Sequence, residues 1–157
     1  MRGFAGITCL CLLCVALAAC GGSGSSATSD RQQIANVFPT AFAAMARGDY
    51  STACSYFSAG EQAKVVAGAK QAGLKASTCA ETFTALIDRY HVTKAQLAQT
   101  FTNGRVGMVH SISIHGDKAT ATFTDTSGGK TYTETDALVR EGGKWKADHI
   151  VKRSQSG

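Results

Sequence analysis

Two histidines and one aspartate are the side chains in this sequence whose positions best suit chemistry. His110 stands two residues before Ile112, and Asp136 stands two residues before Leu138, so strand alternation places both beside apolar neighbours. The same alternation on the last predicted strand puts His149 on the side of a tryptophan. A His/Asp pair in an apolar cavity suits proton transfer on a small hydrophobic substrate. The candidate pocket residues are therefore His110, Asp136, Trp145 and His149, with Glu134 on the same side of its strand as Asp136.

A second interpretation of these residues involves no catalysis. Polar side chains near strand ends often lie at the wet rim of a sheet, and a one-residue bulge would turn the set outward. The fold would then contain either a pocket that binds a ligand without catalysing a reaction, or an interior filled by side chains with no pocket. The four histidines show no short metal-ligand spacing, and no serine lies in a G-x-S-x-G turn. We therefore expect no catalytic residue, no metal and no cofactor, and a proton-transfer enzyme remains the alternative.

The six cysteines separate into an N-terminal group and one later pair. Three lie within an apolar N-terminal run, and Cys20 ends that run. Cys54 and Cys79 remain as an even pair, and such pairs form structural disulfides in exported proteins. We expect a disulfide between them, with two buried free thiols as the alternative.

The N-terminal residues predict an exported, lipid-anchored protein. Arg2 provides a positive start, and no charged residue follows as far as Cys20. The run Leu17-Ala18-Ala19-Cys20 resembles the lipobox of bacterial lipoproteins, in which the thiol is diacylated and the signal is cut before the cysteine. We expect residues 1–19 to be the signal peptide, Cys20 to be lipidated, and the extracytoplasmic face of the cell membrane to be the location. A transmembrane anchor is the alternative, but the apolar run is short and Gly/Ser residues follow it.

Composition limits the mature chain to one domain. The 157 residues are 44% hydrophobic and 17% charged, with a net charge of +5. Residues 20–29 are all small and predict a flexible tether, residues 30–153 a single domain, and residues 154–157 a tail. The positive charge weakly favours anionic headgroups or wall polymers, but it is too small and scattered to indicate a nucleic-acid partner.

Helical patterns fill the first half of the predicted domain. Apolar residues recur at i, i+3, i+4 and i+7 from residue 34 to residue 45, and Gly48 closes this helix. Ser29 with Gln32 forms a capping box at its start, while Pro39 either kinks or divides it. Three shorter helices follow, each with a capping residue: 50–57 after Asp49, 58–73 from Ser58, and 78–90 from Thr78.

The second half of the domain changes to period two. Four segments alternate apolar and polar residues near 108–114, 119–123, 130–140 and 144–151, and glycine-containing turns separate them. This pattern is typical of an antiparallel meander with one solvated face. The predicted fold class is α+β, with N-terminal helices packed on a curved four-stranded antiparallel sheet.

Three segments resemble small bacterial lipoproteins of the nuclear-transport-factor-2-like superfamily. They are the run GDYSTAC at 48–54, the Gly116-Asp117 turn, and the run ALVREGGKWK at 137–146. The likeness covers about residues 30–153 and implies a cone, in which a bent sheet wraps a long helix and leaves a cavity at its open end. The superfamily includes ketosteroid isomerases, polyketide cyclases, dehydratases, transport factors and pocketed proteins with no known reaction. Such a fold does not assign a function.

We expect a membrane-anchored, extracytoplasmic and non-enzymatic module that binds a ligand or partner of the cell envelope. Membrane lipid would hold it through acylated Cys20, and its ligand would be a small apolar molecule, a lipid or an envelope protein. A homodimer through the outer sheet face is a further interpretation. The alternative is a small isomerase- or cyclase-like enzyme with an inward His/Asp pair, which requires His110, His149 and Asp136 to face one cavity.

Overall fold

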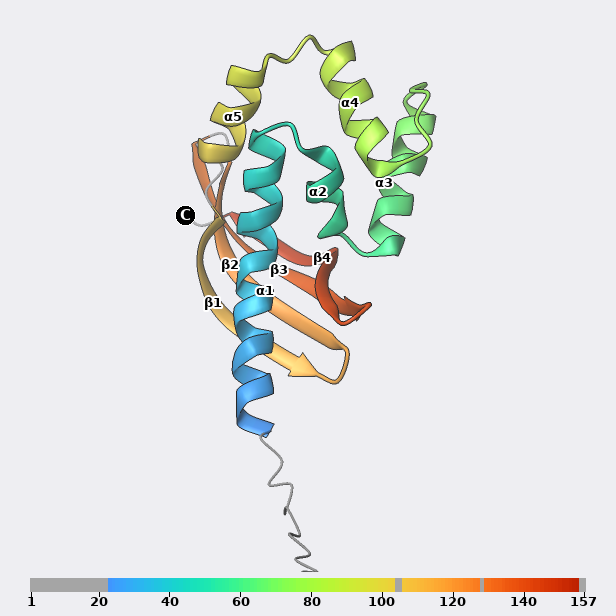
Figure 1. Cartoon of the computed structure of the whole chain (residues 1–157). Helices are drawn as coiled ribbons and strands as arrows, with labels where there is room; N and C mark the ends of the chain where they lie inside the picture. The colour runs from blue at the N-terminus through green and yellow to red at the C-terminus, as the bar shows by residue number, and fades with distance from the viewer. Residues whose placement is uncertain (1–22, 104–105, 128, 156–157) are drawn as a thin grey trace, which may run out of the picture.

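The computed structural model describes residues 23–103, 106–127 and 129–155, so the predicted signal peptide, Cys20 and the last two residues lie outside the described part. Within these residues, five helices precede four strands (Figure 1). The helices are α1 (Ser23–Ala46), α2 (Tyr50–Ser55), α3 (Ala59–Gln71), α4 (Cys79–Arg89) and α5 (Lys94–Asn103). The strands are β1 (Val106–His115), β2 (Lys118–Ser127), β3 (Lys130–Glu141) and β4 (Lys144–Gln155). The predicted α+β class is confirmed.

The four strands form one open antiparallel sheet in the order β1-β2-β3-β4, which is the predicted meander. In Figure 1 the strands curve around one side of α1. The β2–β3 register runs without a shift from Lys118↔Val139 to Ser127↔Lys130. Register shifts occur instead in the β1–β2 and β3–β4 ladders, and both affect candidate site residues.

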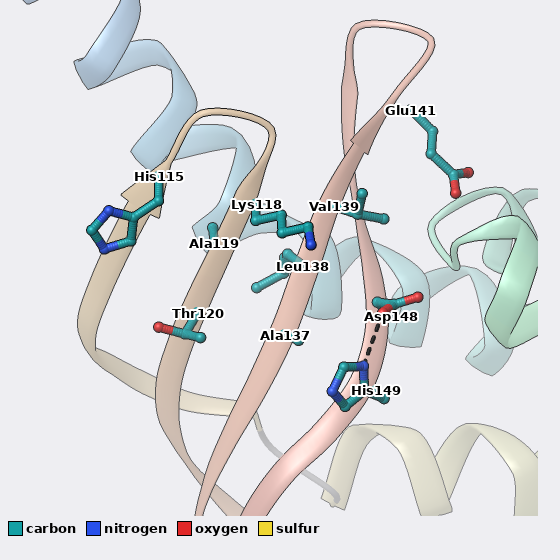
Figure 2. A pocket seen from close by; sticks show the side chains of 10 residues that line it. All are labelled: His115, Lys118, Ala119, Thr120, Ala137, Leu138, Val139, Glu141, Asp148 and His149. Atoms are coloured by element: carbon teal, nitrogen blue, oxygen red, sulfur yellow. Dashed lines mark hydrogen bonds and ion pairs between the residues drawn. The ribbon is translucent and has the colours of Figure 1, made fainter.

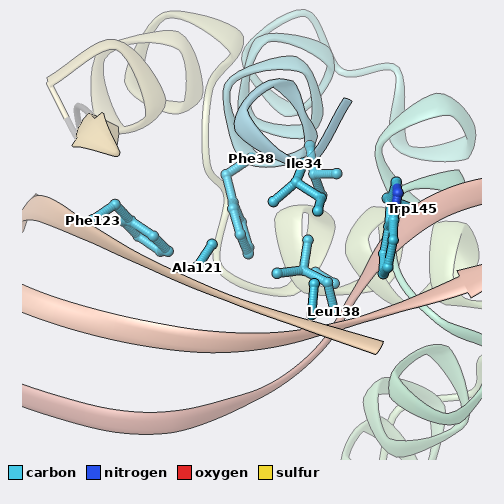
Figure 3. Packing of buried hydrophobic residues seen from close by; sticks show 9 residues of the cluster. Ile34, Phe38, Ala121, Phe123, Leu138 and Trp145 are labelled. Carbon is cyan, nitrogen blue, oxygen red and sulfur yellow. The ribbon is translucent and has the colours of Figure 1, made fainter. Parts of the chain in front are cut away.

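Helix α1 packs along the concave face of the sheet. Ile34, Val37 and Phe38 are buried against strand residues that alternate as predicted (Figure 3). The Phe38 and Phe123 rings lie 4.9 Å apart between their centroids. The strand residues of this cluster are Ala119, Ala121, Phe123, Leu138, Trp145 and Ala147. The apolar residues that recur every 3.6 positions on the helix and every second position on the strands therefore form one shared core.

The start of α1 corrects two expectations. The helix begins at Ser23, so Ser29 lies inside it and is not the predicted N-cap; the predicted tether at residues 20–29 overlaps the helix. Serine, threonine and glycine are poor helix formers, but added turns on a helix that is already packed need no new nucleus. Pro39 lies within one continuous helix, on its exposed side, where water can solvate the carbonyl that the proline leaves without a donor.

The N-terminal half of α1 is fixed to the sheet by Asp30. Its carboxylate accepts hydrogen bonds from the Arg140 guanidinium and from Trp145 Nε1, the latter at 3.1 Å. The Arg140 guanidinium also lies over the Trp145 ring, 4.7 Å from its centroid. The indole hydrogen bond, followed by the Arg140 contact, lowers the pKa of Asp30 below its ordinary value. One carboxylate thus joins α1 to both β3 and β4.

The shorter helices begin at the predicted capping residues. The side chains of Asp49, Ser58 and Thr78 each accept a hydrogen bond from a backbone N–H in the first turn of α2, α3 and α4. The predicted Cys54–Cys79 disulfide is present and joins α2 to the first residue of α4. This bridge holds the outer helices to the part of the fold that contacts α1.

Helix α5 was not predicted. Its sequence has a weak apolar stripe, but Thr93 and Gln96 form a reciprocal capping box with hydrogen bonds of 2.8 and 3.2 Å, and this T-x-x-Q signal was visible in the sequence. Leu97 is buried, and the Phe101 ring lies 5.7 Å from that of Phe42. Helix α5 therefore covers the C-terminal half of α1.

The segment between α2 and α3 pairs with the edge of β4. Ala147 N donates to Tyr56 O at 2.8 Å, and Ser58 N donates to Ala147 O at 2.7 Å. Phe57 thus forms a parallel bridge to Ala147 on the side of β4 away from β3. The pairing brings the start of α3 next to β4, where the candidate site lies.

The disulfide generates a stability prediction. We expect the double change Cys54→Ala and Cys79→Ala to lower the free energy of unfolding by about 3.5 kcal/mol, because the bridge closes a loop of about 26 residues in the unfolded chain. Urea unfolding at pH 7, followed by Trp145 fluorescence, measures the change. The reduced wild-type protein is the matched control and should unfold like the double variant. Equal stability of the oxidised and reduced proteins would contradict the prediction.

Candidate functional site

A pocket of about 210 Å³ lies on the inner side of the sheet, between α1, β4 and the start of α3. We call it the inner pocket. Its apolar wall comes from four phenylalanines on α1, β2 and the α2–α3 segment, together with two residues of β4: Phe38, Phe42, Phe57, Phe123, Ala147 and Ile150. Pockets of this kind, apolar with a few convergent polar groups, are the usual place for a small ligand.

Two buried carboxylates of β3 line the inner pocket. Asp136 is 4% exposed and Glu134 is 9% exposed, and both lie on the same side of β3 as Leu138, as the alternation predicted. Glu134 Oε2 is 3.2 Å from Arg153 Nε, and the Arg153 guanidinium also lies over the Tyr132 ring at 4.3 Å. Buried carboxylates are uncommon because ionised groups lose hydration on burial. Their place beside four aromatic rings marks this pocket as the candidate site.

The rim of the inner pocket contains Glu61 and Asp148. Ser58 Oγ donates to Asp148 Oδ1 at 2.6 Å and accepts from Glu61 N at 3.0 Å. His149 Nδ1 donates to Asp148 Oδ2 at 2.8 Å. The Ser58 hydrogen bond, followed by that of His149, lowers the pKa of Asp148 below its ordinary value. Asp148 therefore stabilises the cap of α3 as an ionised carboxylate.

Ser58, Asp148 and His149 do not have the arrangement of a catalytic triad. The aspartate lies between the serine and the histidine, so the imidazole contacts the carboxylate and the serine hydroxyl donates its proton to the same carboxylate. A serine nucleophile needs a base that takes its proton and an exposed oxygen. Ser58 is 1% exposed and its oxygen caps α3. The three residues are structural.

His110 does not reach the inner pocket, which corrects the sequence prediction. The β1–β2 register shifts between Val109↔Phe123 and Ser111↔Thr122, so His110 is the extra residue of a bulge. Val109 packs against the core, while His110 is exposed and its Nε2 contacts Thr124 Oγ1. Thr124 alternates with the buried Phe123 and so lies on the opposite face from Asp136. The predicted pair of His110 with Asp136 is therefore not formed.

His149 borders the inner pocket, but a second bulge alters its place. The β3–β4 register passes from Leu138↔Ala147 to Ala137↔His149, so Asp148 is an extra residue. Because of this insertion, Ile150 pairs with the inward Asp136, and His149 pairs with Ala137 on the other face. The His149 side chain is about half exposed at the edge of the pocket. Without this extra residue, the alternation of side chains along β4 would have placed His149 inside the pocket.

Trp145 faces inward as predicted, but it lies in the core with α1 and not at the inner pocket (Figure 3). Its indole donates to Asp30, which explains why a polar atom is tolerated there. The pocket also contains residues that were not among the sequence candidates: Phe38, Phe42, Phe57, Glu61, Phe123, Ala147, Asp148 and Ile150. The predicted cap at Ser58 placed the start of α3, but nothing local in the sequence showed that the preceding residue, Phe57, pairs with β4.

A second hollow, of about 340 Å³, lies on the face of the sheet that the helices leave uncovered. Figure 2 shows this outer hollow in front of the strands, with helices behind them. Lys118, Thr120, Ala137 and His149 line it, and Glu141 lies at one end. Its lining residues include no aromatic ring other than histidine, and its charges are mixed. The inner pocket is therefore the better candidate for a small ligand.

Two further observations concern metals and membranes. Within the described part of the chain, no group of three or more His, Cys, Asp or Glu residues is placed to hold a metal ion. Among the same residues, no helix has both the length and the apolar character needed to cross a bilayer.

The Asp148 hydrogen bonds generate a pH prediction. A carboxyl whose pKa is lower in the folded state stabilises the fold above its unfolded pKa and loses that contribution as the pH falls. We expect Asp148→Asn to lower the free energy of unfolding by about 1 kcal/mol at pH 7. The difference should stay constant above about pH 5 and shrink toward about pH 2. Urea unfolding across this range measures it, with Asp117→Asn, an exposed hairpin residue, as the control. A difference that does not change with pH would contradict the assignment.

Comparisons with known proteins identify no family for this chain. No protein-family model, no curated protein and no solved structure matches it. The function must therefore be argued from the geometry and chemistry of the inner pocket.

Proposed function

We propose that this chain is a lipid-anchored module on the extracytoplasmic face of a bacterial membrane, which binds a small molecule and does not transform it. The inner pocket carries this proposal. Four phenylalanine rings and two buried carboxylates share one pocket, and an apolar core alone would not need the carboxylates. We propose that the fold is the cone implied by the resemblance to nuclear-transport-factor-2-like lipoproteins, with this pocket at its open end.

The size of the pocket bounds the ligand. Pockets for drug-sized molecules hold about 300–1,000 Å³, and the inner pocket holds about 210 Å³. The ligand is a small molecule, or one end of a larger one such as a lipid. Its apolar body contacts the phenylalanine rings, because covering these surfaces with carbon removes apolar area from water.

Binding without catalysis fits the groups around the pocket. The one histidine at its edge donates to Asp148, and the other candidate histidine, His110, lies on the far face of the sheet, so neither is paired with Asp136. The serine nearest the rim is held as a helix cap. These contacts are structural, and they support a site that holds its ligand through shape and charge.

The lipid anchor rests on the residues around Cys20. Arg2, the uncharged run and the Leu17-Ala18-Ala19-Cys20 sequence support cleavage before Cys20. α1 begins three positions after that cysteine, so the distance between them is at most about 10 Å. The domain would then work close to the membrane surface.

The anchor can be tested by mass spectrometry of the membrane fraction from a bacterial host. We expect a mature chain that begins at diacylated Cys20, and Cys20→Ser should abolish both the modification and the cleavage. Cys14→Ser is the matched control and should leave both unchanged, because Cys14 lies within the predicted signal. Recovery of an intact residue 1–19 segment in the wild-type membrane protein would contradict the proposal.

Ligand binding can be tested with N-phenyl-1-naphthylamine, an uncharged fluorescent probe of apolar sites. The protein is the chain from residue 20 with Cys20→Ser, because the described packing contacts begin at Asp30 and no acyl chain then competes. We expect saturable binding that Ile150→Ser weakens by about three- to tenfold, since the side chain lines the pocket.

Val151→Ser is the control for this experiment. Val151 and Ile150 are neighbours on β4 and are each 55% exposed, but only Ile150 is among the residues that line the inner pocket. Equal effects of the two changes would place the probe elsewhere. Absence of saturable binding would contradict the proposed function.

A further inference from the structure

We propose that the end of the sheet at its two hairpin turns docks on the anionic headgroups of the membrane that holds the lipid anchor. This inference rests on the proposed function, through acylated Cys20. It follows from the place where α1 begins and from the charges at that end of the sheet.

The hairpin turns that open and close the sheet meet at the N-terminal half of α1. We call this region the hairpin end, and it consists of residues 30–31, 115–118 and 140–146. Arg140 joins its three parts, because its guanidinium contacts Asp30 and its backbone N–H donates to Asp117 O at 2.8 Å. In Figure 1 both turns lie in the lower half of the view, toward the start of α1, while α4 and α5 lie at the top.

The anchor would hold the hairpin end close to the membrane. The distance from Cys20 to the start of α1 is at most about 10 Å, and Asp30 lies seven residues into the helix. At about 1.5 Å per helical residue, Asp30 is within about 20 Å of Cys20. The hairpin end is therefore the part of the described sheet that the linker brings nearest to the lipid.

The hairpin end carries five lysine and arginine side chains and three carboxylates. Two of the cations pair with all three carboxylates, as Arg140 with Asp30 and Asp117, and Lys146 with Glu141. The remaining cations, Arg31, Lys118 and Lys144, are exposed and form no ion pair within the described part of the chain. The surplus of charge at this end is positive.

Three exposed cations suit an anionic membrane surface. Each lysine or arginine near such a surface gains a modest attraction, and the effect falls off within a Debye length. A weak surface is sufficient here, because the acyl anchor makes docking intramolecular and so raises the effective concentration of headgroups. A second copy of the chain would bring like charges together at this end. A soluble polyanion would meet the same cations, but the anchor holds only the membrane beside them.

Docking at the hairpin end sets the direction in which the inner pocket faces. Phe42, which lines that pocket, lies twelve residues after Asp30, and this places it about 18 Å farther along α1. The docked domain therefore presents the pocket on the side away from the membrane. Its ligand would arrive from the aqueous phase.

Sedimentation with lipid vesicles tests this surface, using the chain from residue 20 with Cys20→Ser. The vesicles contain phosphatidylcholine alone, or two parts phosphatidylcholine to one part phosphatidylglycerol, in about 0.1 M NaCl. We expect binding only to the vesicles with phosphatidylglycerol. The double change Lys118→Glu and Lys144→Glu should weaken that binding at least about tenfold, because both charges are reversed at the surface.

The double change Lys70→Glu and Lys75→Glu is the matched control. It reverses the same charge at two exposed lysines, one on α3 and one in the connection to α4, and should weaken binding less than about twofold. Lys118→Gln with Lys144→Gln should weaken binding in the same direction by a smaller factor, and it serves if charge reversal alters the fold.

The outcomes separate this inference from the proposed function. Absence of binding to phosphatidylglycerol vesicles, or equal losses in the two double glutamate variants, would overturn the inference and leave the anchor intact. Tighter binding to polyphosphate than to these vesicles, per phosphate group, would assign the surface to a soluble polyanion and also overturn it. Unmodified Cys20 in the mass spectrum would instead overturn the lipid anchor.

Discussion

The pairing of Ala147 on both of its sides is the constraint on which the candidate site depends. Ala147 pairs with Leu138 in the sheet and with Phe57 at the edge of β4, so neither side of the strand is free at this point. The next residue, Asp148, is the extra residue of the bulge. Its carboxylate accepts a hydrogen bond from the hydroxyl of Ser58, the residue that caps α3. The start of α3, the inward position of Ile150 and the aromatic wall from Phe57 all follow from this short stretch of backbone.

The two faces of the sheet carry different chemistry because β2 and β3 pair without a shift. Their inward residues include Ala121, Phe123, Glu134 and Asp136. Six of their outward residues are threonines that face one another as Thr122↔Thr135, Thr124↔Thr133 and Thr126↔Thr131. The hydroxyls of Thr122 and Thr135 form a hydrogen bond of 2.9 Å between their oxygens. A threonine pair suits a solvated face because the branched side chain favours the strand and the hydroxyl remains hydrated. Glu134 and Asp136 thus lie on the face that α1 covers.

Prediction from the sequence succeeded where the cause was local. The caps at Asp49, Ser58 and Thr78 depend on residues within one turn of the helix, and the inward Asp136 depends on a strand with an unbroken register to β2. His110 was placed wrongly because a bulge depends on how two strands pair, which no single strand encodes. Phe57 and Glu61 line the pocket because their segment lies against β4, which is far away in the sequence and which no local pattern could indicate. Helix α5 was missed although its capping box was visible.

The disulfide has a consequence for binding as well as for folding. Helix α2 is tied to α4 by Cys54–Cys79, and the residues that follow α2 are tied to β4 by the Tyr56 and Ser58 hydrogen bonds. Phe57 lies between the two residues that hydrogen-bond to β4 and three positions after the disulfide, so the fold itself holds this wall of the inner pocket in place. A preorganised wall loses little conformational entropy on binding, and a site of this kind can hold a small molecule with few contacts. Selectivity for the proposed ligand would then rest on its fit to a fixed shape, with no need for the protein to close around it.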